Sequence, residues 1–156
     1  MSNPRRPREE LEERLVSEYM VEKHPNARHM IRVRLGPIPT GMPTGMPTGV
    51  PTTIYGVVRH WADGIAIYPD KIVLIEAKLK LRPEAVGQLL IYEQILPNTP
   101  ELATDAEKKH VLELVYVQGD PDVQDYAQKQ GITCIRYAPD WAVQAYLARA
   151  RWEYIR

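Results

Sequence analysis

The chain has 156 residues, of which 44% are hydrophobic and 26% are charged. This composition is that of a globular protein and the length fits one domain, so disorder and a fibrous fold are excluded. Lys plus Arg and Asp plus Glu each total 20, which excludes a strongly basic domain that binds nucleic acid through its overall charge. Cys134 is the single cysteine, which excludes an internal disulfide and a cysteine zinc site and favours a cytoplasmic setting.

Local groups of basic residues are the candidates for contact with a polyanion, because the chain as a whole carries no net charge. Solvated surface charge is an equally good interpretation of the first of these groups. No apolar run approaches the roughly 18 residues that a membrane span needs, so no membrane partner is expected. The groups are Arg5, Arg6 and Arg8, then Arg28, Arg32 and Arg34, and finally Lys78, Lys80 and Arg82.

The first predicted element is a helix over residues 9–24, which has a proline on either side. Apolar side chains mark its inner face at Leu11, Leu15 and Tyr19. At about 100° per residue, Glu18 and Glu22 fall within about 20° of Leu11, so both are expected on or beside this face. A strand over residues 30–35 follows, because apolar and basic side chains alternate there.

Residues 36–53 carry a short repeat, PTGM, PTGM and PTGV, whose prolines and glycines prevent a helix or a regular central strand. We expect a flexible hairpin tip that joins the strand over 30–35 to a second β-like run over 54–60. A flap that follows a nucleic-acid backbone is the functional alternative.

Two further β-like runs, over residues 62–68 and 71–79, flank a predicted turn at Pro69 and Asp70. The second run reads KIVLIEAKL and is apolar on both faces. A strand of this kind is normally covered on both sides, so charged residues inside it need an explanation.

The second half of the chain alternates between helices and strands, and a proline at the first turn supports the first of these helices. This order predicts an α/β fold in a single domain over residues 1–156, with a mixed central sheet flanked by helices. The expected elements are a helix over 83–95, a strand over 111–117, a helix over 120–130, a strand over 132–137 and a helix over 139–151.

The predicted turn carries the main functional inference. A symmetric two-residue turn pairs Tyr68 with Lys71 and, five residues further along each strand, Asp63 with Glu76. Directly opposed like charges are destabilising unless something neutralises them. Carboxylate oxygens suit Mg²⁺ or Mn²⁺, and Lys78 lies on the same face as Glu76, where its ammonium group can approach a phosphate held by the cation.

Two alternatives remain for this pair of carboxylates. In the first, they are strand-end charges paired with lysine or arginine, although surface charges seldom interrupt a run as apolar as IVLIEAKL. In the second, a three-residue loop replaces the two-residue turn and shifts the pairing by one residue. That shift would place Asp63 and Glu76 on opposite faces of the sheet.

With these residues identified, the chain resembles the PD-(D/E)xK nuclease superfamily, in particular its RecB-like members with a QxxxY motif. The resemblance covers roughly residues 9–117 and follows the order of the predicted elements. The matching residues are Asp63 in WADGIAIY, Glu76-Ala77-Lys78 in VLIEAKLK, and Gln88 and Tyr92 in GQLLIYEQI.

The resemblance implies a restriction-endonuclease-like core in the order α-β-β-β-α-β and metal-dependent hydrolysis of phosphodiester bonds. By this resemblance Asp63, Glu76 and the carbonyl of Ala77 hold Mg²⁺ or Mn²⁺, while Lys78 assists catalysis. The sequence departs from the family's name at one position, since Ala62 stands where the proline before the aspartate is expected.

Two helices are implied to complete the site. Gln88 and Tyr92 lie four residues apart on one helical face, where an amide and a phenol can touch the active site or the DNA backbone. Family members often contribute an acidic residue from the first helix as well. Glu18 is favoured for this role, and Glu12 and Glu22 remain as alternatives.

The leading functional hypothesis is a nuclease that acts on DNA in repair, recombination or phage DNA processing. The alternative is a DNA-binding or assembly subunit of a larger restriction, packaging or repair complex, without turnover of its own. A complete set of Asp63, Glu76 and Lys78 counts against the alternative, because binding alone does not need it. The expected assembly is a homo-oligomer or a larger nucleic-acid-processing complex.

Overall fold

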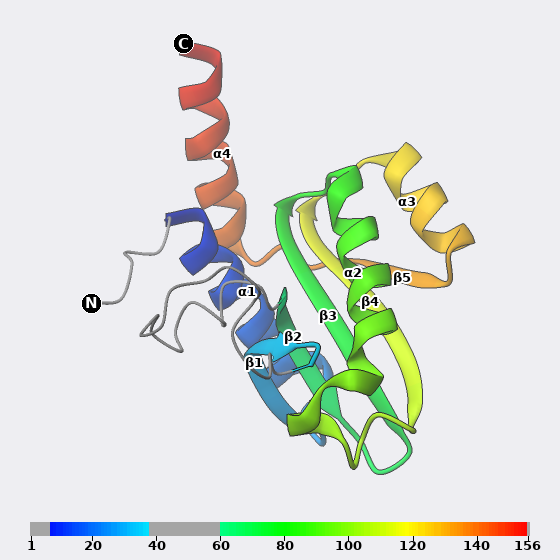
Figure 1. Ribbon diagram of the computed structural model, residues 1–156. Coiled ribbons are helices and arrows are strands. Elements are labelled where there is room, and N and C mark those ends of the chain that lie inside the picture. Colours follow the sequence, from blue (N-terminus) through cyan, green and yellow to red (C-terminus); the bar gives the residue numbers. More distant parts are fainter. Residues whose placement is uncertain (1–6, 38–59, 156) are drawn as a thin grey trace, which may run out of the picture.

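The computed structural model describes residues 7–37 and 60–155, with side chains described as far as Arg151. A mixed sheet has the strand order β1-β2-β3-β4-β5, antiparallel from β1 to β3 and parallel from β3 to β5. The strands are β1 (Arg28–Leu35), β2 (His60–Ile67), β3 (Lys71–Lys80), β4 (Lys109–Gln118) and β5 (Ile132–Arg136). The helices are α1 (Pro7–Lys23), α2 (Pro83–Ile95), α3 (Pro121–Lys129) and α4 (Asp140–Ile155), with short 3-10 turns at Leu96–Asn98 and Pro100–Leu102 (Figure 1).

The predicted fold class is confirmed, because the structure is an α/β protein in which helices flank a mixed five-stranded sheet. Its first elements follow the expected order α-β-β-β-α-β. The bounds of α2 are those predicted over 83–95. Helix α1 begins at Pro7, earlier than expected, since proline is tolerated in the first turn of a helix.

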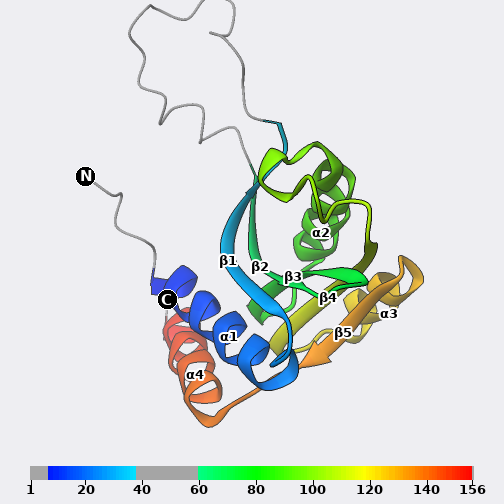
Figure 2. The same cartoon turned by 90° about the horizontal axis from the view of Figure 1, so that it is seen from below.

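Alternation along the strands builds two apolar layers. Side chains of β3 such as Val73 and Ile75 pack with α1 and α4 on one face of the sheet. Ile72 and Leu74, which point the other way, pack with α2 and α3. Figure 2 shows these two pairs of helices on opposite sides of the sheet. None of the helices in the described part of the chain is long and apolar enough to cross a membrane.

The repeat-bearing segment falls almost wholly outside the described residues, so the hairpin tip and the flap both remain predictions. Of the β-like run expected over 54–60, the described part is His60, which belongs to β2. The expected break at Trp61 is wrong, because Trp61 pairs with Arg34 in the continuous ladder between β1 and β2.

A close approach at Gly64 lets α1 lie directly on the sheet. A Cβ atom added at this glycine would lie 2.8 Å from Cγ2 of Val16 and 3.1 Å from Cε of Met20, and both of these residues belong to α1. Any larger side chain at position 64 would therefore push α1 away from the sheet. Because Glu12 precedes Val16 by one helical turn, this contact also fixes how near Glu12 comes to the end of β3.

Candidate active site

The candidate site depends on the register between β2 and β3. The N–H of Tyr68 donates to the carbonyl of Lys71 over 2.9 Å, which closes a two-residue turn. The ladder beyond this turn has the same register throughout, so the alternative shift by one residue is excluded. Continued by one pair, the register sets Asp63 opposite Glu76 on the same face of the sheet.

Acidic side chains take over the hydrogen bonds that β2 no longer supplies where the two strands separate. The ladder with β2 ends at Ile75 of β3. Further along β3, the N–H of Ala77 donates to Oδ2 of Asp63 over 2.9 Å, and the N–H of Leu79 donates to Oε2 of Glu12 over 3.1 Å. The backbone of β3 thus fixes two carboxylates that come from two different elements.

Glu76 has one oxygen with a partner and one without. Its side chain is buried, and Oε1 lies 3.1 Å from Nζ of Lys78. Oε2 is also buried and has no hydrogen-bond donor among the described residues, and the neighbouring carboxyl of Asp63 can bond to Glu76 only when one of the two is protonated. An unsatisfied buried acceptor costs free energy, so a purely structural ion pair with Lys78 does not account for Glu76.

The three charged groups shift each other's pKa. Burial raises the pKa of Asp63. Burial, reinforced by the negative charge of Asp63, raises the pKa of Glu76 well above its ordinary value. Burial alone would lower the pKa of Lys78, but the carboxylates of Glu76, Glu12 and Asp63 outweigh it and the pKa is raised. Three carboxylates therefore share one ammonium group, an arrangement that favours a further positive charge.

Helix α2 brings Gln88 and Tyr92 to the same place. Oε1 of Gln88 is a second buried acceptor without a hydrogen-bond partner among the described residues. Burial, with the charges of Glu76 and Asp63, raises the pKa of the Tyr92 phenol. All of these side chains line one hollow of about 280 Å³, here called the carboxylate cavity, formed by Arg8, Glu9, Glu12, Glu13, Arg32, Trp61, Asp63, Glu76, Lys78, Gln88 and Tyr92.

The structure does not bring Glu18, the favoured acidic residue from the first helix, to the carboxylate cavity. Oε2 of Glu18 accepts a hydrogen bond from Nε1 of Trp141 over 2.6 Å, and its Oε1 accepts one from Nε of Arg14 over 3.1 Å. Glu22 accepts a hydrogen bond from the hydroxyl of Tyr137 over 2.7 Å. Both glutamates therefore connect α1 to the C-terminal part of the chain and lie away from the carboxylate cavity.

Glu12 takes the expected position because the buried face of α1 is rotated away from Leu11. Leu11 is half-buried, whereas Glu12 is 7% exposed and lies on the buried face. The buried residues of α1 are Glu12, Leu15, Val16, Tyr19 and Met20. A pattern of apolar residues centres the face on the leucines and leaves a buried glutamate outside it, so periodicity could not separate Glu12 from Glu18.

Arg32 lines the carboxylate cavity, but the sequence indicated it only as one member of the basic group Arg28, Arg32 and Arg34. Its φ of 51° is the one positive φ of a non-glycine residue in the described part of the chain. The register between β1 and β2 continues on both sides of it and sets it opposite Asp63, where its positive charge helps to lower the pKa of that carboxyl against the effect of burial. Its guanidinium lies 5.2 Å from the ring centre of Trp61.

Other members of the three expected basic groups are divided between the site and the surface. Arg28 lies 3.1 Å from a carboxylate oxygen of Asp105, away from the cavity. Arg34 lies over the ring of Trp61 at 4.5 Å. Arg8 and Lys78 line the carboxylate cavity, and Lys80 and Arg82 line a second hollow beside it. Arg5 and Arg6 lie outside the described residues.

The donor set fits a cation that also uses water and substrate. No three His, Cys, Asp or Glu side chains in the described ranges are close enough to hold a metal ion by themselves. Mg²⁺ commonly takes only one or two carboxylates from a protein and keeps several waters. Asp63 and Glu76 provide such a pair, and the unpartnered Oε2 of Glu76 is an oxygen ligand of the required hard type.

Comparison with known proteins finds solved structures of similar fold but no matching family. No protein-family model matches the sequence, and no curated protein matches it. Among solved structures, a protein of unknown function, AF1548, has a TM-score of 0.52 at 10% identity, over 83% of this chain and 60% of that chain. At this identity the similarity concerns the fold alone.

Two further solved structures have lower TM-scores. A repair endonuclease from Pyrococcus abyssi has a TM-score of 0.48 at 16% identity, over 89% of this chain and 50% of that chain. A complex of EndoMS with double-stranded DNA has a TM-score of 0.45 at 18% identity, over 89% of this chain and 48% of that chain. The present chain thus spans about half of the length of these two proteins.

Proposed function

We propose that the protein is a metal-dependent nuclease that hydrolyses phosphodiester bonds in DNA, with Mg²⁺ or Mn²⁺ as its cofactor. The observation that carries this proposal is the buried Oε2 of Glu76, which has no hydrogen-bond partner among the described residues and lies beside Asp63 and Lys78. Stability alone would favour an aliphatic side chain at this position of an apolar strand. A site for cation and phosphate explains why a carboxylate is there.

Each residue of the carboxylate cavity has a role in this proposal. Asp63, Glu76 and the carbonyl of Ala77 hold the cation, and Glu12 is the additional acidic residue from α1. A bound divalent cation supplies Lewis-acid stabilisation of negative charge on the phosphate. The protein's own contribution to the same charge comes from the ammonium group of Lys78, which is already held in place by Glu76.

The uncharged residues position the substrate. In hydrolysis, the oxygen of a water molecule forms a bond to phosphorus while one P–O ester bond breaks, and negative charge builds up on the phosphate oxygens. Tyr92 keeps its proton at neutral pH, as tyrosines ordinarily do, and burial raises its pKa further, so its hydroxyl is available as a donor. The amide of Gln88 offers both a donor and an acceptor to the same cavity.

A cleavage assay tests the proposal. Purified protein is mixed with linear, circular, single-stranded and branched DNA in Mg²⁺, in Mn²⁺, and in EDTA without added metal. We expect products in Mg²⁺ or Mn²⁺ and none in EDTA. Equal cleavage in EDTA would contradict the metal site, and binding of DNA without cleavage under all conditions would favour the alternative of a DNA-binding or assembly subunit.

Replacing Arg32 by glycine is expected to separate function from stability. Glycine adopts a positive φ without strain, which offsets the cost of a glycine in a strand, so the free energy of unfolding should stay within about 1 kcal/mol of wild type. Loss of the guanidinium beside Asp63 should lower the cleavage rate roughly tenfold, equivalent to about 1.4 kcal/mol. Urea unfolding and single-turnover cleavage measure the two effects.

The matched control for this substitution is Arg34→Gly in the same strand. Arg34 also lies over Trp61 but does not line the carboxylate cavity. Its backbone φ is not positive, so glycine there should destabilise the protein by about 0.5–1 kcal/mol and leave cleavage near wild type. An equal loss of cleavage in both variants would mean that Arg32 has no special role.

A further inference from the structure

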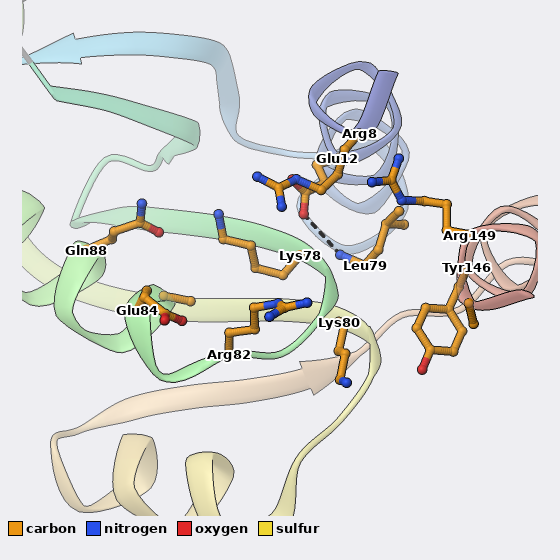
Figure 3. Close-up of a pocket in the computed structure, with 12 residues that line it drawn as sticks. Arg8, Glu12, Lys78, Leu79, Lys80, Arg82, Glu84, Gln88, Tyr146 and Arg149 are labelled. Atoms are coloured by element: carbon orange, nitrogen blue, oxygen red, sulfur yellow. Dashed lines mark hydrogen bonds and ion pairs between the residues drawn. The ribbon is translucent and has the colours of Figure 1, made fainter. Parts of the chain in front are cut away.

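A second hollow adjoins the carboxylate cavity. It has a volume of about 350 Å³ and shares Arg8, Glu12, Lys78 and Gln88 with that cavity, so the two are neighbours. Its outer part, here called the basic pocket, is formed by Lys80, Arg82, Glu84, Tyr146 and Arg149. Figure 3 shows that these side chains come from the end of β3, the start of α2 and the helix α4.

The basic pocket carries an excess of positive charge. Within the described residues, no ion pair neutralises Lys80, Arg82 or Arg149. Of the two carboxylates that line the hollow, Glu12 is already bonded to the backbone of β3 and paired with Arg8, which leaves Glu84. Three cations that line one hollow repel each other, and an anion bound among them reduces this repulsion.

The start of α2 adds to this potential. Arg82 is the N-cap residue of α2, and no side chain caps the helix there. The N-terminal end of a helix carries a partial positive charge and unpaired N–H groups. An anion in the basic pocket is therefore favoured both by the side chains and by the helix.

One wall of the basic pocket is aromatic. Tyr146 is half-buried and packs against the apolar layer between the sheet and α4, so the position of its ring is fixed. A positively charged groove combined with an aromatic ring is typical of proteins that bind single-stranded nucleic acid, because an unpaired base can stack on the ring. Binding to a duplex backbone would require the cations but not the ring.

We propose that the basic pocket binds the nucleotide adjacent to the bond that is cut, on a single strand, with its phosphate between Lys80, Arg82 and Arg149 and its base on Tyr146. This inference rests on the proposed nuclease function, because the pocket adjoins the carboxylate cavity. It names single-stranded polynucleotide as the substrate class. DNA and RNA share this chemistry and are separated by experiment.

The test measures binding in EDTA, where the proposed nuclease does not cut, by fluorescence anisotropy of a labelled single strand of about 12 nucleotides. DNA, RNA and a DNA duplex are compared over a range of salt concentrations. For Arg82→Ala and Arg149→Ala we expect weaker binding, and a fall of about 0.7 in the slope of log K against log salt for each phosphate that the protein no longer neutralises. Arg151→Ala is the control, since Arg151 is an exposed residue of α4 that does not line the pocket.

Substitutions of Tyr146 should affect binding differently from substitutions of the basic residues. Tyr146→Leu should weaken single-strand binding by about 5- to 150-fold without a change in the salt slope, because stacking releases no counterions. Tyr146→Phe keeps the ring and should restore most of the affinity, which separates loss of stacking from a packing defect. Duplex binding should be unaffected by either change at Tyr146. The wild-type preference between DNA and RNA strands then identifies the source of the single strand.

The outcomes distinguish this inference from the proposed function. Wild-type salt slopes in Arg82→Ala and Arg149→Ala, or a duplex that binds as tightly as the single strand, would overturn the basic pocket as a single-strand site even if the protein cleaves DNA. Pocket-dependent binding of single strands without metal-dependent cleavage would support the pocket and overturn the nuclease. A KM that rises in the pocket variants but not in Arg151→Ala supports both.

Discussion

Replacing Lys78 by methionine is expected to lower the rate of phosphodiester cleavage about 10²–10³-fold, the effect of losing one positioned charge or donor at a reacting centre. Methionine fills the space of the lysine stem, so the loss should come from the missing ammonium group. The ammonium group of Lys78 lies 3.1 Å from Oε1 of Glu76. It lines the carboxylate cavity, and because Lys78 follows Glu76 by two residues in β3, both side chains lie on the same face of the sheet.

The substitution should leave cation binding largely in place, because the ligand oxygens remain. Titration calorimetry with Mn²⁺ measures this directly. Lys71→Met is the matched control, since Lys71 lies at the other end of β3, over the ring of Tyr68 at 4.7 Å. If Lys78→Met cleaves at the rate of Lys71→Met, the proposed role of Lys78 in charge stabilisation is wrong.

Glu76→Gln is the second substitution with a large expected effect, and it should act in opposite directions on cleavage and on stability. Loss of the ligand should abolish metal-dependent cleavage and Mn²⁺ binding. The metal-free protein should become more stable at neutral pH, by an amount on the order of 1 kcal/mol or a rise of roughly 2–4 °C in Tm. Lys78 keeps Asp63 and Glu12 as charged neighbours, so glutamine does not leave it unpaired.

The stability gain should depend on pH. Burial raises the pKa of Glu76 above its ordinary value of 4.5, so the folded protein holds this proton more tightly than the unfolded chain does. The stabilising contribution of the protonated group is fully present below pH 4.5 and is lost as pH rises through the folded-state pKa. The advantage of Glu76→Gln should therefore be small in acid and grow towards neutral pH. A melting temperature that changes with pH to the same extent in the wild type and in Glu76→Gln would contradict this prediction.

The sequence was most informative where a local rule fixes geometry. Counting back and forward from a two-residue turn places Asp63 opposite Glu76, because the pairing of a short hairpin leaves few other choices. The spacing of Gln88 and Tyr92 likewise follows from the period of one helix, and a proline in the first turn indicates where α2 begins. These inferences need only residues that are close in the sequence.

The features of the site that the sequence did not predict depend on packing between residues far apart in the chain. Which glutamate of α1 reaches the site depends on how the helix rotates on β2, and Gly64 sets that packing through side chains far away in the sequence. The left-handed backbone of Arg32 has no signal in the residue type, because arginine has no preference for positive φ. The contribution of α4 to the basic pocket requires knowing where the last helix lies, which a pattern of residues does not specify.

The separation of β2 from β3 also has a consequence for solubility. A strand whose N–H groups have lost their neighbour is a template for pairing with another chain, and natural proteins protect such edges. At Ala77 and Leu79 the protection comes from the carboxylates of Asp63 and Glu12, which accept hydrogen bonds from N–H groups that β2 does not pair. The acidic residues to which we assign a role in the proposed chemistry thus also protect this end of the sheet from pairing with a second molecule. We therefore expect a chain that loses either carboxylate to aggregate more readily than wild type, which light scattering of the purified variants would measure.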